Sequence, residues 1–337
     1  MQAKFFYNIL GVKVISDLRI FPELFIQKES FDNPDIVIMK KNIHLNKQKY
    51  NNFSVKFYFL PKKEFAFDSS FWFYKLKILV KNLIGTPTEV YYTCEEKKFY
   101  NIRKIIRQIL LFKLVQKGIF LMHCGAGSWD DFGILVFAPS DTGKTSTILS
   151  LAREYNMSII GDDMCLLKNL FVYRYTDRVS IYPKEEFFEK LHKKNKIILL
   201  SFFAKKVISF FPYFSLKIHP NIKLPMDYCG KVAQHAQIRK IFILKKGKKI
   251  DVDFENEDII NEILSINGEF LIPKGFGLTF WERLCYAFNI NPFLVGDLYK
   301  QYLRNIIKDV SYEIIYGNSY KEFSKCIYER VKKETKK

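Results

Sequence analysis

The stretch from Gly133 to Tyr155 constrains the fold of this chain more than any other. Gly133 to Phe137 predicts an apolar strand, and Thr145 to Tyr155 predicts a helix. The loop between them reads Ala, four variable residues, Gly-Lys and Thr. In a strand-loop-helix setting, successive backbone N–H groups and the start of the helix point at one place and bind phosphate groups there. A structural turn that binds no nucleotide is the alternative.

The side chains of this loop predict a site for ATP with Mg²⁺. Lys144 would neutralise the β- and γ-phosphate oxygens, and the Thr145 hydroxyl would ligate Mg²⁺. Ala138 replaces the usual first glycine, and Asp141 stands where many such loops carry another glycine. Because aspartate tolerates positive φ better than most residues, we expect the path of the loop to be retained. The predicted ATP-binding residues are Ala138, Pro139, Ser140, Asp141, Thr142, Gly143, Lys144, Thr145 and Ser146.

An acidic pair follows the loop closely. Asp162 and Asp163 come after the short apolar strand predicted at Ser158 to Ile160, and Asp162 lies 18 residues after Lys144. One carboxylate could hold Mg²⁺ while the other accepts a proton from the incoming nucleophile. The sequence leaves open which aspartate has which role. A cap or a turn is the alternative for such a pair.

His123 lies on the strand predicted at Gly118 to Ala126, which precedes the loop. Its register beside the loop makes it a candidate metal ligand or phosphate contact, whereas a histidine on an apolar strand is more often a core residue. This strand and Gly133 to Phe137 predict an antiparallel hairpin. Asp130 and Asp131 are then turn residues.

Three segments together resemble a known kinase core. Met122-His123-Cys124, the loop and Ile160-Gly161-Asp162-Asp163 have the order and close spacing of HPr kinase/phosphorylase and ATP-dependent phosphoenolpyruvate carboxykinase. Ordinary P-loop enzymes place the second acidic motif much farther along the chain. The resemblance implies that Lys144 and Thr145 take the nucleotide and metal, that Asp162 or Asp163 supplies the metal and base roles, and that His123 has an accessory role.

A looser likeness extends over most of the chain to HPr-kinase-related proteins of bacterial and archaeal biosynthetic clusters. The segments that carry it are Leu10 to Asp17, Phe21 to Leu24, Tyr182-Pro183 and Ile238 to Leu244. The chain has no counterpart of the C-terminal signature of HPr kinase/phosphorylase or of the oxaloacetate-binding segments of the carboxykinase. We therefore expect ATP-dependent phosphorylation of an unidentified hydroxyl, either a serine of a protein or peptide or a small molecule. The alternative is a non-catalytic ATP sensor or scaffold of a biosynthetic complex.

The order of elements predicts an α/β (α+β) fold with two domains. Short aromatic and β-branched runs predict a β-rich N-terminal domain over residues 1–99, and residues 100–337 would form an HPr-kinase-like P-loop domain with a soft boundary. Apolar positions at steps of three and four predict a helix from Tyr100 to Lys117, ended by Gly118. Farther on we expect a strand at Ile238 to Lys246 and helices near Phe280 to Phe288 and Ile314 to Val331.

The net charge of +19 is spread along the whole chain. It suits a negatively charged partner, such as a phosphate-bearing small molecule, an anionic membrane or nucleic acid, or it serves general solubility. No nucleic-acid recognition motif accompanies the charge. The six cysteines form no C-x-x-C pair and no zinc-like cluster, which predicts reduced thiols.

We expect a cytoplasmic location, because the N-terminal residues show no secretory signal. The apolar run at residues 197–218 is interrupted by Lys205, Lys206 and Pro212, so it does not predict a bilayer span. A buried helical hairpin is favoured there, and a flexible cover over the site or a foot on a membrane surface are the functional alternatives. A homo-oligomer is compatible with the sequence.

Overall fold

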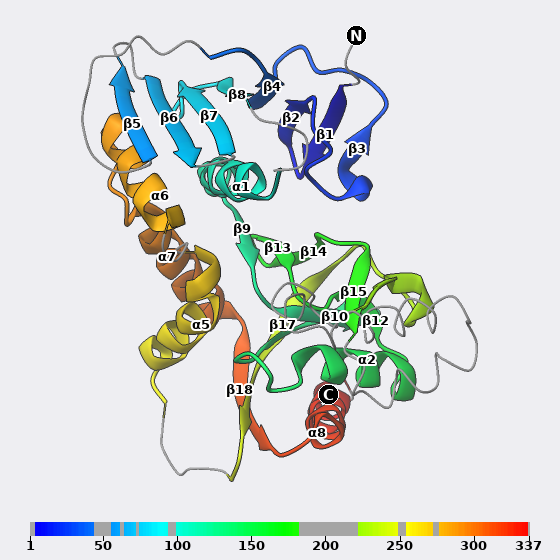
Figure 1. Cartoon of the computed structure of the whole chain (residues 1–337). Coiled ribbons are helices and arrows are strands. Elements are labelled where there is room, and N and C mark those ends of the chain that lie inside the picture. Colours follow the sequence, from blue (N-terminus) through cyan, green and yellow to red (C-terminus); the bar gives the residue numbers. More distant parts are fainter. Residues whose placement is uncertain are drawn as a thin grey trace, which may run out of the picture. The chain divides into compact units, whose positions relative to one another are not determined.

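The computed structural model describes residues 4–43, 55–60, 64–71, 74–93, 99–181, 222–248, 254–271 and 276–335 (Figure 1). Contacts within the chain divide it into two compact units. The first comprises Met1–Leu121 and Asn267–Asn305, and the second Met122–Ile266 and Ile306–Lys337. Both combine helices with sheets that contain parallel and antiparallel pairs, which confirms the α/β (α+β) class in its coarse form. The predicted domain boundary near residue 100 falls within the first unit and stays a prediction.

The first unit contains an eight-stranded sheet in the order β3-β1-β2-β4-β8-β7-β6-β5. β2 pairs in parallel with β4 and β4 with β8, whereas the β1–β2, β1–β3, β5–β6, β6–β7 and β7–β8 pairs are antiparallel. Buried and less buried side chains alternate along β2 and β8, as expected for strands with one face on the core. The strands are β1 (Phe5–Ile9), β2 (Val12–Ser16), β3 (Ile26–Gln27), β4 (Ile36–Lys40), β5 (Val55–Leu60), β6 (Glu64–Phe71), β7 (Tyr74–Lys81) and β8 (Thr88–Thr93).

The predicted helix at Tyr100 to Lys117 is confirmed as α1 (Phe99–Gln116). Gly118, with φ of 67°, lies just beyond its end, where glycine adopts a left-handed conformation without the cost of a Cβ. The apolar face of α1 is buried, and the Phe112 ring lies 5.9 Å from that of Trp281 on α6 (Phe276–Ala287). α6 confirms the helix expected near Phe280. Helices α5 (Asn256–Leu271) and α7 (Leu294–Asp309) contribute residues on both sides of the division between the units.

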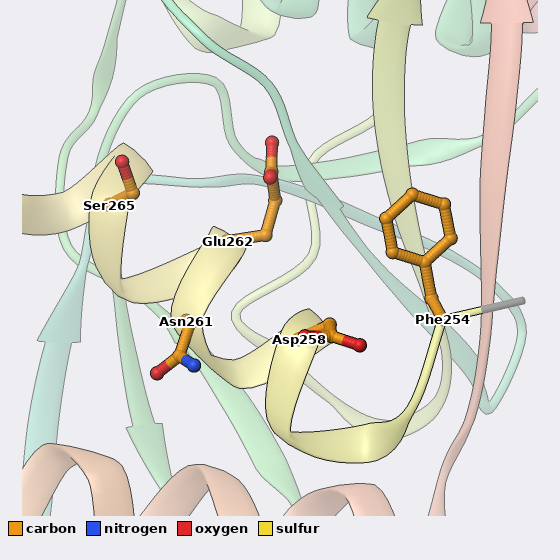
Figure 2. Close-up of a pocket in the computed structure, with 5 residues that line it drawn as sticks. All are labelled: Phe254, Asp258, Asn261, Glu262 and Ser265. Atoms are coloured by element: carbon orange, nitrogen blue, oxygen red, sulfur yellow. The ribbon is translucent and has the colours of Figure 1, made fainter. Parts of the chain in front are cut away.

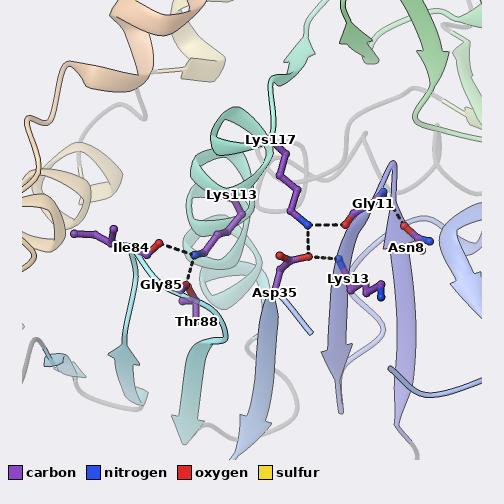
Figure 3. Close-up of polar contacts among 9 residues, drawn as sticks. All are labelled: Asn8, Gly11, Lys13, Asp35, Ile84, Gly85, Thr88, Lys113 and Lys117. Atoms are coloured by element: carbon purple, nitrogen blue, oxygen red, sulfur yellow. Dashed lines mark hydrogen bonds and ion pairs between the residues drawn. The ribbon is translucent and has the colours of Figure 1, made fainter. Parts of the chain in front are cut away.

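Two lysines near the end of α1 bind the strand connections of the first unit (Figure 3). Lys117 Nζ lies 2.7 Å from Asp35 Oδ2 and donates to the Gly11 carbonyl at 2.7 Å. Lys113, only 3% exposed, donates to the carbonyls of Gly85 and Ile84 at 2.5 and 3.5 Å. Desolvation lowers the pKa of Lys113 from 10.5 to about 8, against the opposing charge of Asp35.

The second unit is built on a sheet in which β12, β10, β11, β17, β14 and β13 follow one another. β17 pairs in parallel with β11 and also with β18, while the β10–β11, β10–β12, β13–β14 and β14–β17 pairs are antiparallel. The strands are β10 (Gly125–Trp129), β11 (Phe132–Phe137), β12 (Ser158–Gly161), β13 (Cys165–Lys168), β14 (Phe171–Arg174), β17 (His235–Lys246) and β18 (Ser311–Gly317). A separate two-stranded pair is formed by β15 (Arg178–Ile181) and β16 (Ile222–Pro225).

Helices α2 (Lys144–Glu154) and α8 (Tyr320–Glu334) lie side by side on this sheet (Figure 1). They share one apolar core with β11, β12 and β17, which includes Ile148, Phe242 and Phe323. The hydroxyls of Ser150 and Ser324 lie 2.9 Å apart within it. α2, which confirms the helix predicted at Thr145 to Tyr155, is therefore held by a helix from a distant part of the chain.

Two sequence predictions need correction. The strand predicted from Gly118 to Ala126 consists of β9 (Ile119–Met122) and β10, with His123 between them, so the hairpin is formed by β10 and β11. The helix predicted from Ile314 is wrong over its first residues, because Ile314 lies in β18 and pairs with Ile243 of β17. α8 starts only after Ser319, whose Oγ accepts from the Glu322 amide at its N-cap. The predictions for residues 197–218 and for Tyr182-Pro183 lie outside the described residues.

Candidate functional site

The predicted phosphate-binding loop runs from the end of β11 to the start of α2. Asp141 and Gly143 both have positive φ, of 61° and 105°. The φ of Ala138, by contrast, is not positive. Ala138 is 1% exposed and belongs to the core shared by α2 and α8. Both departures from the usual glycines thus have a physical account. The chain path at Ala138 needs no glycine, and aspartate is tolerated in the left-handed region at Asp141.

The loop is fixed from the sheet as well as from its own ends. Lys246, the last residue of β17, donates from Nζ to the backbone oxygen of Asp141. Thr142 N–H bonds Pro139 O at 3.3 Å, and Gly143 occupies the N-cap of α2 without any capping side chain. No N-cap side chain therefore covers the start of α2, which suits a helix start that would receive an anion.

Lys144 is the first residue of α2, and its buried ammonium group makes an ion pair but no hydrogen bond with residues that the structure describes. The residue is 8% exposed, and its Nζ makes no hydrogen bond within the described residues. Its Nζ lies 3.6 Å from Asp163 Oδ1, which also lies 2.7 Å from His123 Nε2. The structure thus brings together three predicted site residues: His123 from the β9–β10 connection, Lys144 from α2 and Asp163 from beyond β12.

The electrostatics of this trio favour an ionised Asp163. Partial desolvation acts to raise the pKa of Asp163, but the hydrogen bond from His123 and the charge of Lys144 outweigh it and lower that pKa from 3.8 to about 2. The Asp163 side chain nevertheless keeps 55% of its surface exposed. A ligand can therefore reach the carboxylate from solvent.

Asp162 lies in a different environment from Asp163. It is only 1% exposed and faces the interior, where the Cys165 thiol also lies. Cys165 Sγ lies 3.6 Å from the carbonyl oxygen of Cys124, the residue that follows His123. The two adjacent carboxylates therefore differ: Asp163 borders Lys144 and solvent, whereas Asp162 is enclosed.

Two other aspartates lie where the hairpin prediction put them. Asp130, with φ of 48°, and Asp131 form the two-residue turn between Trp129 and Phe132, which pair with each other. This confirms their assignment as turn residues.

Lys144 and the start of α2 would suit the phosphate chain of a nucleotide, and Thr145, the next residue of α2, would be the candidate ligand of Mg²⁺. The decisive observation is Lys144 Nζ, a buried cation without a hydrogen-bond partner in the described part of the chain, beside uncapped helix amides. Across the same described residues, no three His, Cys, Asp or Glu side chains are grouped as a metal site made by protein alone. A Mg²⁺ bound by one or two protein oxygens and the phosphates of its nucleotide needs no such group.

Comparison with known proteins brings no assignment to this geometry. No family model matches the chain, and a search of curated proteins finds no match.

Two residues that support the site, Lys246 and Gly125, belong to none of the predicted motifs. Lys246 carries no motif, and its role follows only from the pairing of β17 with β11. Gly125 is required by close packing, since a Cβ there would lie 2.7 Å from Ile148 and 3.4 Å from Lys144. The only sequence signal for Gly125 is the glycine-rich run Gly125-Ala126-Gly127.

A pocket of about 440 Å³ lies elsewhere in the second unit, against α5 (Figure 2). Lys245 of β17 contacts two of the residues that line this pocket. Its Nζ forms an ion pair with Glu262 at 3.3 Å and lies 4.9 Å from the centre of the Phe254 ring. None of the predicted site residues lines it. Its lining residues are Phe254, Asp258, Asn261, Glu262 and Ser265.

Among the described residues, no helix has both the length and the apolar character needed to cross a bilayer.

Proposed function

We propose that the chain binds Mg-ATP on the Ala138 to Thr145 loop and transfers its γ-phosphate to a hydroxyl acceptor. The observation that carries this proposal is the buried Lys144 ammonium, which has, among the described residues, no hydrogen bond and only an ion pair at 3.6 Å with the Asp163 carboxylate. Leaving a buried cation without hydrogen bonds costs free energy, and such an arrangement is typical of a group that binds an anionic ligand. The uncapped start of α2 supplies further donors to the same ligand.

Lys144 and the loop amides would hold the phosphate chain, and Thr145 would hold the metal. Mg²⁺, when bound, supplies positive charge to the phosphate oxygens. Lys144 would stabilise the charge that develops on the oxygen leaving with ADP. Because phosphoryl transfer passes through a loose transition state, placing the acceptor in line with the γ-phosphate contributes most of the catalysis.

Asp163 would position the acceptor hydroxyl and take its proton. The hydroxyl oxygen forms a bond to the γ-phosphorus, the bond from that phosphorus to the bridging oxygen of ADP breaks, and the proton passes to Asp163. With a pKa of about 2, Asp163 is a weak base while Lys144 and His123 are directed at it. When Lys144 turns to the phosphates, its lowering effect on the Asp163 pKa weakens, so nucleotide binding itself would strengthen the base.

The test uses Lys144→Ala and Asp163→Asn, with Lys231→Ala as a control for the loss of an exposed lysine. Binding of Mg-ATP is measured by calorimetry, and transfer from radiolabelled ATP is measured with fractionated peptide and metabolite pools as acceptors. Lys144→Ala should lose both binding and transfer. Asp163→Asn should keep binding and lose transfer by about 100-fold or more, the range of a general base.

Full transfer in both site variants would refute the proposal. The alternative, a non-catalytic ATP sensor or scaffold, is supported by the exposed Asp141 carboxylate on a loop that receives phosphates. Mg-ATP binding that depends on Lys144, with no transfer to any fraction by the wild-type protein, would favour that alternative.

A further inference from the structure

Arg174, the last residue of β14, has a guanidinium group that is partly buried. Its Nε is buried and has no hydrogen-bond partner within the described residues. The residue as a whole is partly exposed. A guanidinium carries five N–H donors, so burying part of it unbonded costs free energy and calls for an explanation.

The strand geometry shows which way Arg174 points. Successive side chains of a strand face opposite sides of the sheet. Tyr173 lies on the outer side, where its ring stacks on His235 at 5.6 Å, while Val172 is 0% exposed on the inner side. Arg174 therefore shares the inner side with Val172. It also lies directly opposite Cys165 in the antiparallel pair of β14 with β13, so their side chains are neighbours.

This position is next to the proposed phosphotransfer site. Cys165 follows Asp163 by two residues, and its Sγ contacts the backbone of Cys124, next to His123. Interaction with Cys124 and burial raise the pKa of the Cys165 thiol, and the charge of Lys144 opposes that rise, as expected for a thiol close to Lys144. Arg174 thus stands across one strand pair from the segment that carries Asp163.

We propose that Arg174 binds an oxyanion in the site of Lys144 and Asp163, either a phosphate oxygen of the nucleotide or an anionic group of the acceptor. This assignment rests on the proposed function for the identity of the ligand. Arg174 and Lys144 supply two cations with unmet hydrogen-bonding capacity, which suits a ligand with several negative oxygens. The planar guanidinium fork matches phosphate or carboxylate oxygens in a bidentate contact.

The experiment compares Arg174→Met and Arg174→Lys with Arg178→Met, a control that removes an exposed arginine of β15. Calorimetry measures the binding of Mg-ATP, of Mg-ADP, and of inorganic phosphate with and without saturating Mg-ADP. Thermal unfolding of the ligand-free protein is measured in parallel. Arg174→Met should lower the affinity for at least one of these ligands by about tenfold or more, because one charge-assisted contact is lost. Arg174→Lys should recover part of the affinity, and the control should bind like wild type.

The pattern of loss identifies which oxyanion Arg174 contacts. If the Arg174→Met variant binds Mg-ATP more weakly but Mg-ADP as wild type does, Arg174 contacts the γ-phosphate. If it binds both nucleotides more weakly, Arg174 contacts the inner phosphates. If the only affinity that falls is the one for inorganic phosphate in the presence of saturating Mg-ADP, Arg174 contacts an anionic group of the acceptor. Because the wild-type guanidinium is partly unbonded, the ligand-free Arg174→Met protein should unfold at the same or a higher temperature, which a purely structural arginine would not allow.

Two negative results are distinguishable. If wild type and Arg178→Met bind Mg-ATP while Arg174→Met binds every probe equally well, the role of Arg174 is overturned and the proposed function stands. If no variant binds nucleotide but inorganic phosphate binding depends on Arg174, the oxyanion site stands and the proposed function fails. Lower thermal stability of ligand-free Arg174→Met with unchanged binding would also overturn the proposal, because Arg174 would then be structural.

Discussion

The buried Lys113 of α1 predicts an unusual pH dependence of stability. Burial lowers the pKa of the Lys113 amine to about 8 in the folded protein, from 10.5 for the exposed amine of the unfolded chain. Between these values the unfolded chain binds one more proton than the folded protein, so the free energy of unfolding rises with pH. The gap corresponds to a gain of at most about 3 kcal/mol, at about 1.4 kcal/mol per pH unit. Below about pH 8 the folded protein carries the full cost of the buried ammonium.

The variant Lys113→Met isolates this effect from other titrations in the same range. Urea unfolding of wild type and variant is compared at pH 7, 9 and 10, with the fluorescence of Trp281, near Phe112 of α1, contributing to the signal. The stability difference between the two proteins should move in favour of wild type as pH rises, by up to the same ~3 kcal/mol. An exposed control, Lys40→Met, should show no such drift. A difference between wild type and Lys113→Met that is constant over this range would refute the reasoning.

Two further predictions concern the loop and its helix. Gly143→Ala should cost about 1–2 kcal/mol in urea unfolding and weaken Mg-ATP binding, because φ of 105° strains any residue with a Cβ; unchanged stability and binding would contradict the assigned loop path. Ser324→Ala should cost about 1–3 kcal/mol, because it removes the hydroxyl that pairs with buried Ser150. Ser150→Ala should cost less, because Ser324 Oγ still donates to the Lys321 carbonyl at 3.1 Å. The double variant should cost less than the sum of the two. Additive losses in that cycle would show that the two hydroxyls act independently.

The parts of the fold that the sequence predicts well are those specified by neighbouring residues. α1 follows from apolar positions at helical spacing and from Gly118, and the start of α2 follows from the loop before it. The helix predicted at Ile314 failed because Ile314 and Ile315 suit a helix and a strand equally in a short apolar run. Pairing with β17, 71 residues earlier at Ile243, decided in favour of the strand.

The candidate site likewise contains residues that local motifs predict and residues that only the fold brings to it. Lys144, Asp163 and His123 belong to motifs, and the structure brings their side chains together. The sequence could not predict that Asp162 is buried and Asp163 is exposed, because this difference arises from how the chain turns after β12. Lys246 and Arg174 carry no local pattern, and only the neighbours of β17 and β14 in the sheet reveal where they lie.

The packing of α2 against α8 has a consequence for the order in which the protein is made. Ser150 and Ser324 are separated by 174 residues. At about 5–20 residues per second, a ribosome needs on the order of ten to thirty seconds to synthesise that interval. During this time α2 has left the ribosome while the helix that covers its apolar face does not yet exist. The predicted phosphate-binding loop is thus encoded before the middle of the chain, but the packing of the helix that follows it is completed late. Nascent chains would therefore depend on chaperones to shield α2 until α8 emerges.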